Sequence, residues 1–272
     1  MAHASGEISR EPDREAGAQH VTLRRPVQAV DVEAPWRWLR LGWQDLVRAR
    51  GVSLSFGILI ALASLLLINL LWHVDLLPYA LPLAAGFMFV APALAICFYD
   101  ISRRLERGET VSFGAVALAW KPNVSQIAGM GLVMMLFQLA WIRFATLLFA
   151  LFFGPDPASW DRFIQALLFS TDGLPFLIVG TLSGGILAIL AFAIGVTAFP
   201  MLLDRDVGTA TAIATSVRAA IVNWRVMTGW AALIVVFTAA GIVTGCLGLI
   251  VTMPLIGHAS WHAYRELVPR EG

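Results

Sequence analysis

The chain has 272 residues, of which 58% are hydrophobic and 14% are charged. Soluble domains average about 45–50% apolar and about 25% charged residues, so the composition predicts an integral membrane protein rather than a soluble one. The net charge is +1, and no basic run interleaved with aromatic residues occurs, which argues against a nucleic-acid partner.

The first 32 residues are polar and of mixed charge, and they lack the apolar core of a secretory signal peptide. We expect residues 1–32 to form a disordered cytoplasmic tail. The membrane domain is expected over residues 33–268, and residues 269–272 then form a short cytoplasmic tail.

Six segments of the chain are apolar and long enough to cross the bilayer. A membrane span needs about 20 mainly apolar residues. The last apolar stretch, 226–264, would be about 58 Å long as one helix, so we divide it at a turn near Gly245 and Gly248. The predicted spans cover about residues 52–72, 76–98, 124–153, 174–200, 226–243 and 246–264.

The positive charges give the orientation. With six spans, all lysine and arginine residues except Arg143 and Arg162 fall on one side of the membrane. Lysine and arginine accumulate on the cytoplasmic side of membrane proteins, so both termini are predicted to be cytoplasmic. A single last span would place Arg265 and Arg270 outside and break the pattern.

A short amphipathic segment precedes each odd-numbered span, at residues 35–50, 110–121 and 209–224. In the first, the apolar residues recur at intervals of three and four and therefore share one helical face. We expect these helices to lie in the membrane interface; the alternative is that they pack on the protein as ordinary loop helices. The first stripe comprises Trp36, Leu39, Trp43, Leu46 and Val47, with Arg37, Arg40, Gln44 and Arg48 on the opposite face.

Each even-numbered span carries one proline near its cytoplasmic end: Pro92, Pro200 and Pro254. A proline within a helix frees a carbonyl and bends the axis. The sequence therefore predicts an all-α membrane protein of six transmembrane helices in three repeated hairpins, each preceded by an amphipathic interfacial helix on the cytoplasmic side.

Arg143 interrupts the third predicted span. A charge within a span is rare and costs about 2.5–3.5 kcal/mol on insertion scales. One interpretation is an anion or lipid-headgroup site, or a gating ion pair with Asp75 or Asp172. The alternative is an arginine that extends to the interface or holds a structural salt bridge.

His258 and His262 are four residues apart, and Glu266 follows one turn later. This spacing places three candidate metal ligands on one helical face. Polar residues are also expected here, at the cytoplasmic end of the last span, so they are weak candidates. His73 lies at the opposite face and cannot supply a second haem ligand, so we predict no cofactor.

The chain lacks the familiar catalytic motifs, among them the nucleophile elbow, the zinc-protease histidine pair and the phosphate-binding glycine loop. We therefore predict that it is not an enzyme.

Several strings resemble a bacterial family of integral membrane proteins catalogued as a domain of unknown function. They are 103–108 (RRLERG), 140–143 (AWIR), 173–176 (GLPF), 200–206 (PMLLDRD), 215–219 (TSVRA) and 254–265 (PLIGHASWHAYR). The resemblance extends over about residues 35–268 and implies a bacterial inner-membrane location, but no activity. Some relatives are labelled cytochrome-oxidase-like. The layout also resembles the membrane domain of some bacterial glycerophosphodiester phosphodiesterases, although no hydrolase domain is present here.

Two function classes remain. The first is a non-enzymatic scaffold or accessory protein that organises lipid or another membrane protein complex, and it predicts a closed apolar core. The second is a transporter or channel for a small solute or lipid, and it predicts a water-accessible cavity that reaches Arg143, because transport paths are built from intramembrane polar groups.

Overall fold

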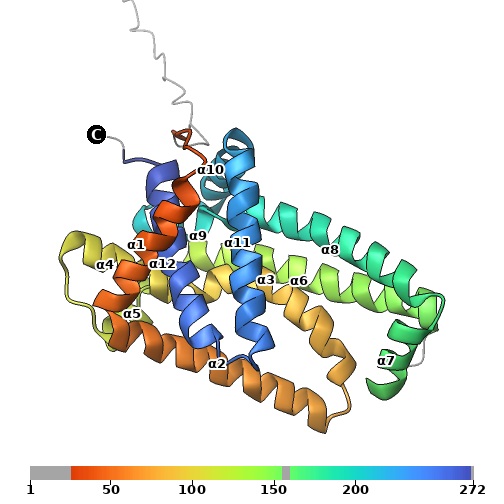
Figure 1. Cartoon of the computed structure of the whole chain (residues 1–272). Helices are drawn as coiled ribbons and strands as arrows, with labels where there is room; N and C mark the ends of the chain where they lie inside the picture. The colour runs from red at the N-terminus through yellow and green to blue at the C-terminus, as the bar shows by residue number, and fades with distance from the viewer. Residues whose placement is uncertain (1–25, 155–159, 271–272) are drawn as a thin grey trace, which may run out of the picture.

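The computed structural model describes residues 26–154 and 160–270, and in these residues all regular structure is helical (Figure 1). The longer helices are α1 (Ala34–Arg48), α2 (Arg50–His73), α3 (Ala80–Leu94), α4 (Ile96–Arg107), α6 (Val124–Phe153), α7 (Trp160–Phe169), α8 (Gly173–Gly195), α10 (Thr209–Val222), α11 (Trp224–Val243) and α12 (Leu249–Leu267). Four short helical segments complete the chain: η1 (Leu77–Tyr79), α5 (Phe113–Ala117), η2 (Lys121–Asn123) and α9 (Ala198–Asp204).

Four segments of the described chain are long and apolar enough to cross a membrane: Arg50–His73, Phe113–Phe153, Gly173–Asp204 and Trp224–Val243. They coincide with the first, third, fourth and fifth predicted spans. The second predicted span is divided between η1, α3 and the start of α4. The sixth falls on α12, which is a separate helix after the turn that follows Val243 but is not among the four.

The joints before two of the candidate spans have nearly the same backbone conformation. Between α1 and α2, Ala49 has φ −110° and ψ 30°, and between α10 and α11, Asn223 has φ −110° and ψ 29°. In both places a single non-helical residue separates a segment predicted to be amphipathic from a long apolar helix. In the middle segment predicted to be amphipathic, residues 110–121, only α5 is α-helical, so the helix there is shorter.

The predicted proline bends differ from one another. Helix α8 ends at Gly195, and Pro200 lies in the next helix, α9. Because proline has no amide hydrogen, Pro200 cannot donate to the carbonyl of Val196, and the helix is interrupted at Val196 and Thr197. The amide of Thr197 donates instead to the buried Ser216 hydroxyl of α10, at 3.1 Å. Helix α3 ends just after Pro92, whereas α12 runs through Pro254 without interruption.

Helix α12 is the centre of the fold, because α1, α2, α4 and α11 all pack against it. Its side chains are buried over most of its length, and Trp261 and Tyr264 are fully inaccessible. Small residues allow the close approach: a Cβ at Gly42 of α1 would lie 2.6 Å from the backbone nitrogen of Ala259.

The N-terminal segment 26–32 is hydrogen-bonded to this core, and Val27 and Val30 pack against it. The amide of Gln28 donates to the carbonyl of Leu267 at 2.9 Å. The amide of Val30 donates to the side-chain oxygen of Asn223, also at 2.9 Å. Residues 26–32 therefore belong to the fold rather than to the tail predicted over 1–32, and the remainder of that tail lies outside the described residues.

Helices α3, α6 and α8 form a second group, in which each helix packs on the other two. In Figure 1 the α11–α12 hairpin crosses the direction of α6 and α8 steeply, so the candidate spans do not form one parallel bundle. Helix α10 packs on both α8 and α11, whereas α8 and α11 make few contacts with each other. The two helices therefore diverge from α10 and leave a wedge between them.

Candidate functional site

A chain of buried polar side chains surrounds His258 of α12. Its Nε2 lies 3.0 Å from the Ser53 hydroxyl of α2, and its Nδ1 lies 2.8 Å from the Ser102 hydroxyl of α4. Ser102 also bonds to the Asp45 carboxylate of α1. One assignment satisfies every group: Ser53 donates to Nε2, the Nδ1–H donates to Ser102, and Ser102 donates to Asp45. The chain thus joins four helices through His258.

Asp45 is also bonded to the second predicted histidine, because Nε2 of His262 lies 2.8 Å from its Oδ2. Burial raises the pKa of the Asp45 carboxyl, but the hydrogen bonds from His262 and Ser102 outweigh burial and hold this pKa below its usual value. Asp45 is therefore ionised in the folded protein at neutral pH, although its side chain is almost fully buried.

Glu266 has separate partners on α1. Its carboxylate accepts from Nη2 of Arg37 at 2.5 Å and from Nε1 of Trp38 at 2.9 Å. His258, His262 and Glu266 therefore lie on one side of α12, toward α1 and α2, but each is engaged by its own group. Within the described ranges no three His, Cys, Asp or Glu side chains gather in a way that could hold a metal ion.

A second cluster joins α4 to the other side of α12. Glu106 accepts from Nε1 of Trp261 at 3.1 Å and from Nη2 of Arg265 at 3.0 Å. Asp204, at the end of α9, accepts from the hydroxyl of Tyr264 at 3.1 Å and from Nη2 of Arg107 at 2.9 Å. Charged and aromatic side chains thus lock the C-terminal half of α12 into place.

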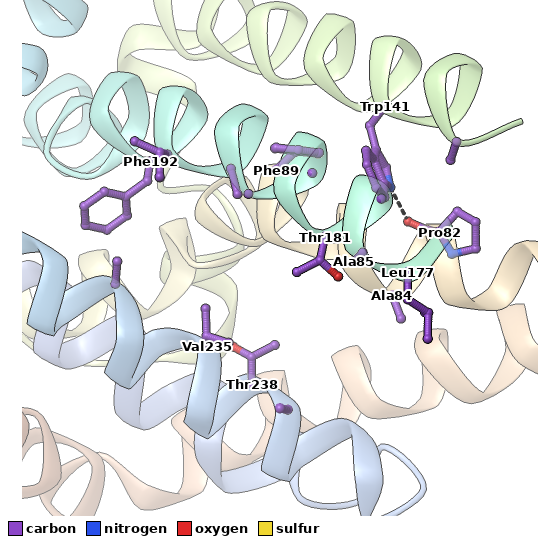
Figure 2. A pocket seen from close by; sticks show the side chains of 18 of the residues that line it. Pro82, Ala84, Ala85, Phe89, Trp141, Leu177, Thr181, Phe192, Val235 and Thr238 are labelled. Carbon is purple, nitrogen blue, oxygen red and sulfur yellow. Dashed lines mark hydrogen bonds between the residues drawn. The ribbon is translucent and has the colours of Figure 1, made fainter. Parts of the chain in front are cut away.

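A cavity of about 1020 Å³ occupies the wedge between α8 and α11 (Figure 2). Small-molecule sites typically measure about 300–1,000 Å³ and are mostly apolar. Its walls are aromatic and small apolar residues of α3, α6, α8 and α11, among them Phe89, Phe192, Ala85 and Val235. The indole of Trp141 in one wall donates to the carbonyl of Pro82 at 2.7 Å.

The proposed Arg143 site is not assembled in the structure. Arg143 lies on α6 with an exposed side chain, makes no ion pair with any described residue and does not line the cavity. Asp172 is exposed at the residue before α8. Asp75 follows α2 with φ 56° and lines one end of the cavity. Neither carboxylate pairs with Arg143, so the role of these three residues stays a prediction.

The cavity departs from both predictions about the core. The scaffold prediction was a closed core, but the wedge is open. The transporter prediction was a polar cavity that reaches Arg143, but the walls of the wedge are apolar and do not include Arg143. The chemistry available there is the binding of apolar groups, although Asp75 and several threonines, among them Thr181 and Thr238, also line the cavity (Figure 2).

Sequence reasoning missed Asp45, Ser53 and Ser102. All three are polar residues on helices that bury a face, and Asp45 lies on the side of α1 opposite Trp43 and Val47. A helical projection of α1 places Asp45 on the same side as Trp38 and Gly42, away from Arg40. This position is the signal that could have identified Asp45 as a buried charge.

Comparison with known proteins gives one match. The model of a family described as "Predicted integral membrane protein (DUF2189)" matches residues 80–204. This range contains three of the six strings that carried the resemblance and most of a fourth, 200–206, and it is narrower than the 35–268 expected from them. No curated protein and no solved structure matches the chain. Over residues 80–204 the chain therefore resembles a family of integral membrane proteins of unknown function.

Proposed function

We propose that this chain is a non-enzymatic accessory protein of the bacterial inner membrane, which binds another membrane protein through the outer face of α1. Both termini are cytoplasmic in this proposal, and the chain crosses the membrane six times in three related units. The nearly equal backbone conformations at Ala49 and Asn223 support the repeat, and the distribution of arginine supports the orientation.

The exposed face of α1 is the observation that carries the proposal. Trp36, Trp43 and Val47 are 60%, 51% and 50% exposed, while the opposite face of the same helix is buried against α12. Arg40 is exposed beside them. Tryptophan and arginine are the residues that most often dominate protein interfaces. The network around His258 and Glu266 fixes α1, so this face is presented rigidly.

Site-specific photocrosslinking in cells tests the proposal. A photoreactive amino acid at Trp43 should give a discrete adduct with one other protein. The control position is Leu66 of α2, which is 69% exposed and lies on a candidate membrane span, so it should crosslink to lipid alone. Only lipid adducts at Trp43 would refute the partner and indicate that α1 lies in the membrane interface instead.

Cysteine labelling tests the six-span topology. In a protein whose native cysteines are replaced, cysteines placed at His73 and Leu247 should react only from the outside, whereas cysteines at Arg107 and Gly208 should react only from the cytoplasm; Leu247 is used because Cys246 is buried. Mixed accessibility within either pair contradicts six spans.

A transporter of a small solute or lipid is the second candidate. The open cavity favours it, but the walls of the cavity are apolar and do not include Arg143, so an apolar solute or a lipid fits better than a polar solute. If Arg143 takes part in transport, proteoliposomes that contain the wild-type protein should show flux of the solute or lipid, and the substitution Arg143→Gln should abolish this flux. Flux that is absent, or unchanged by the substitution, removes this candidate.

A further inference from the structure

We propose that the wedge between α8 and α11 is a lipid site, which takes the acyl chains of an anionic phospholipid whose phosphate lies beside Arg225. This inference is independent of the partner proposed for α1, because it concerns a different surface and a different ligand.

The shape of the wedge argues for flexible chains rather than for a partner helix. Helices α8 and α11 both contact α10 but scarcely contact each other, so the space between them narrows toward α10 and widens away from it. A transmembrane helix is a cylinder of nearly constant diameter, about 10–12 Å with its side chains. It cannot fill the narrow end, whereas an acyl chain adapts to it.

The site is long enough to hold the acyl chains of a lipid in one leaflet of the bilayer. The α11 residues that line it recur at intervals of three and four from Trp224 to Ile242. From Trp224 to Ile242 the site extends about 27 Å along the helix, close to the roughly 30 Å of hydrocarbon that the two leaflets form together, so the acyl chains of one phospholipid fill about the half of the site nearer Arg225. The walls combine aromatic rings with alanine and glycine, and they offer acyl chains a continuous apolar surface.

The charges at the two ends set the direction of the lipid. At one end Asp75 lines the cavity, and its carboxylate repels a phosphate. At the other end the Arg225 guanidinium lies 5.3 Å from the centre of the Trp224 ring, and Trp224 itself lines the cavity. Tryptophan prefers the headgroup region, and basic residues attract anionic lipid there, so the phosphate belongs at this end.

Two neighbouring valines on α11 give a matched test of whether the cavity binds acyl chains. Val235 lines the cavity, whereas Val236 is 61% exposed and does not. The full-length protein is reconstituted in nanodiscs of phosphatidylcholine and phosphatidylglycerol, transferred to mild detergent, and its retained lipid is counted by native mass spectrometry. Val235→Trp should lower the lipid-bound fraction about tenfold, equivalent to about 1.4 kcal/mol, and Val236→Trp should leave it unchanged.

Arginine substitutions test the headgroup part. Arg225→Gln should abolish the preference for phosphatidylglycerol while phosphatidylcholine still binds. Arg218→Gln is the control: Arg218 lies on α10, is exposed and does not line the cavity, so this variant should keep the preference. Equal loss in both variants would show general surface attraction and overturn the assignment of the phosphate to Arg225.

A second pair keeps the test decisive if Val235→Trp fails to fold, as judged by gel filtration. Thr181→Trp fills the cavity from α8, and Ile186→Trp, on the same helix but outside the cavity, is its control. The proposal is overturned if the folded wild-type protein retains no phospholipid, or if cavity and control variants retain the same amount. Crosslinking of position 235 to a protein helix instead of lipid would also overturn it.

Discussion

The close approach of α1 to α12 at Gly42 makes Gly42→Ala a direct test of the packing. Here a Cβ would lie 2.6 Å from the backbone nitrogen of Ala259 and 3.0 Å from its Cα, so the two helices must move apart. Overpacking of this kind costs about 1–3 kcal/mol, and the better helix propensity of alanine returns up to about 1 kcal/mol. The net loss should be about 1–2 kcal/mol, which lowers Tm by about 2–8 °C for a chain of this size.

The assay is thermal unfolding of the purified protein in mild detergent, followed by tryptophan fluorescence. Gly131→Ala is the control, because a Cβ at this position on α6 meets open space, and this variant should be as stable as the wild type or more stable. Adding Ala259→Gly to Gly42→Ala removes the Ala259 side chain but not its backbone nitrogen, so it should restore stability only in part. A Gly42→Ala protein as stable as Gly131→Ala would refute the reasoning.

Three further outcomes follow from the buried network and from Arg143. His258→Leu leaves the buried Ser53 hydroxyl without its partner, while Ser102 keeps its bond to Asp45, and should cost about 1–3 kcal/mol, whereas His73→Leu, at an exposed position, should change stability by less than about 0.5 kcal/mol; equal effects would contradict the network. Because the fold lowers the pKa of Asp45, its contribution is complete above the unfolded value of about 3.9 and is lost as pH falls through the lower folded value. Asp45→Asn should therefore lower Tm at pH 7 and much less at pH 3, and a constant difference would be inconsistent with an ionised Asp45. Arg143→Gln should change the unfolding free energy by no more than about 0.5 kcal/mol, and a loss above about 2 kcal/mol would mean that Arg143 has a partner.

The helices were accessible from sequence because their signals are local. Apolar runs of about 20 residues or more predicted spans that coincide with α2, α6, α8 and α11, and these helices lie in the four segments that can cross a membrane. The glycines of the last apolar stretch predicted the turn between α11 and α12. The family resemblance was also correct, since residues 80–204 match a family of integral membrane proteins.

The contacts of the site were not accessible, because they join residues far apart in the chain. Asp45 meets His262, and Glu106 meets Trp261, only after α1 and α4 have packed on α12. Nothing in the spacing of residues along one helix encodes such a pair. The cavity has the same origin: it arises from the angle between α8 and α11, which the hydrophobic pattern of neither helix determines.

The central position of α12 has a consequence for synthesis. Of the described helices, α12, against which α1, α2, α4 and α11 pack, is the last to leave the ribosome, and α1, which makes its most extensive contact, is the first. Until α12 has been made, α1 has no surface on which to bury Trp38, and Asp45 has no histidine partner. A chain interrupted before residue 249 lacks α12. It therefore exposes the apolar face of α1 and leaves the Asp45 carboxylate without its histidine partner, and quality-control proteases can recognise incomplete chains by such features.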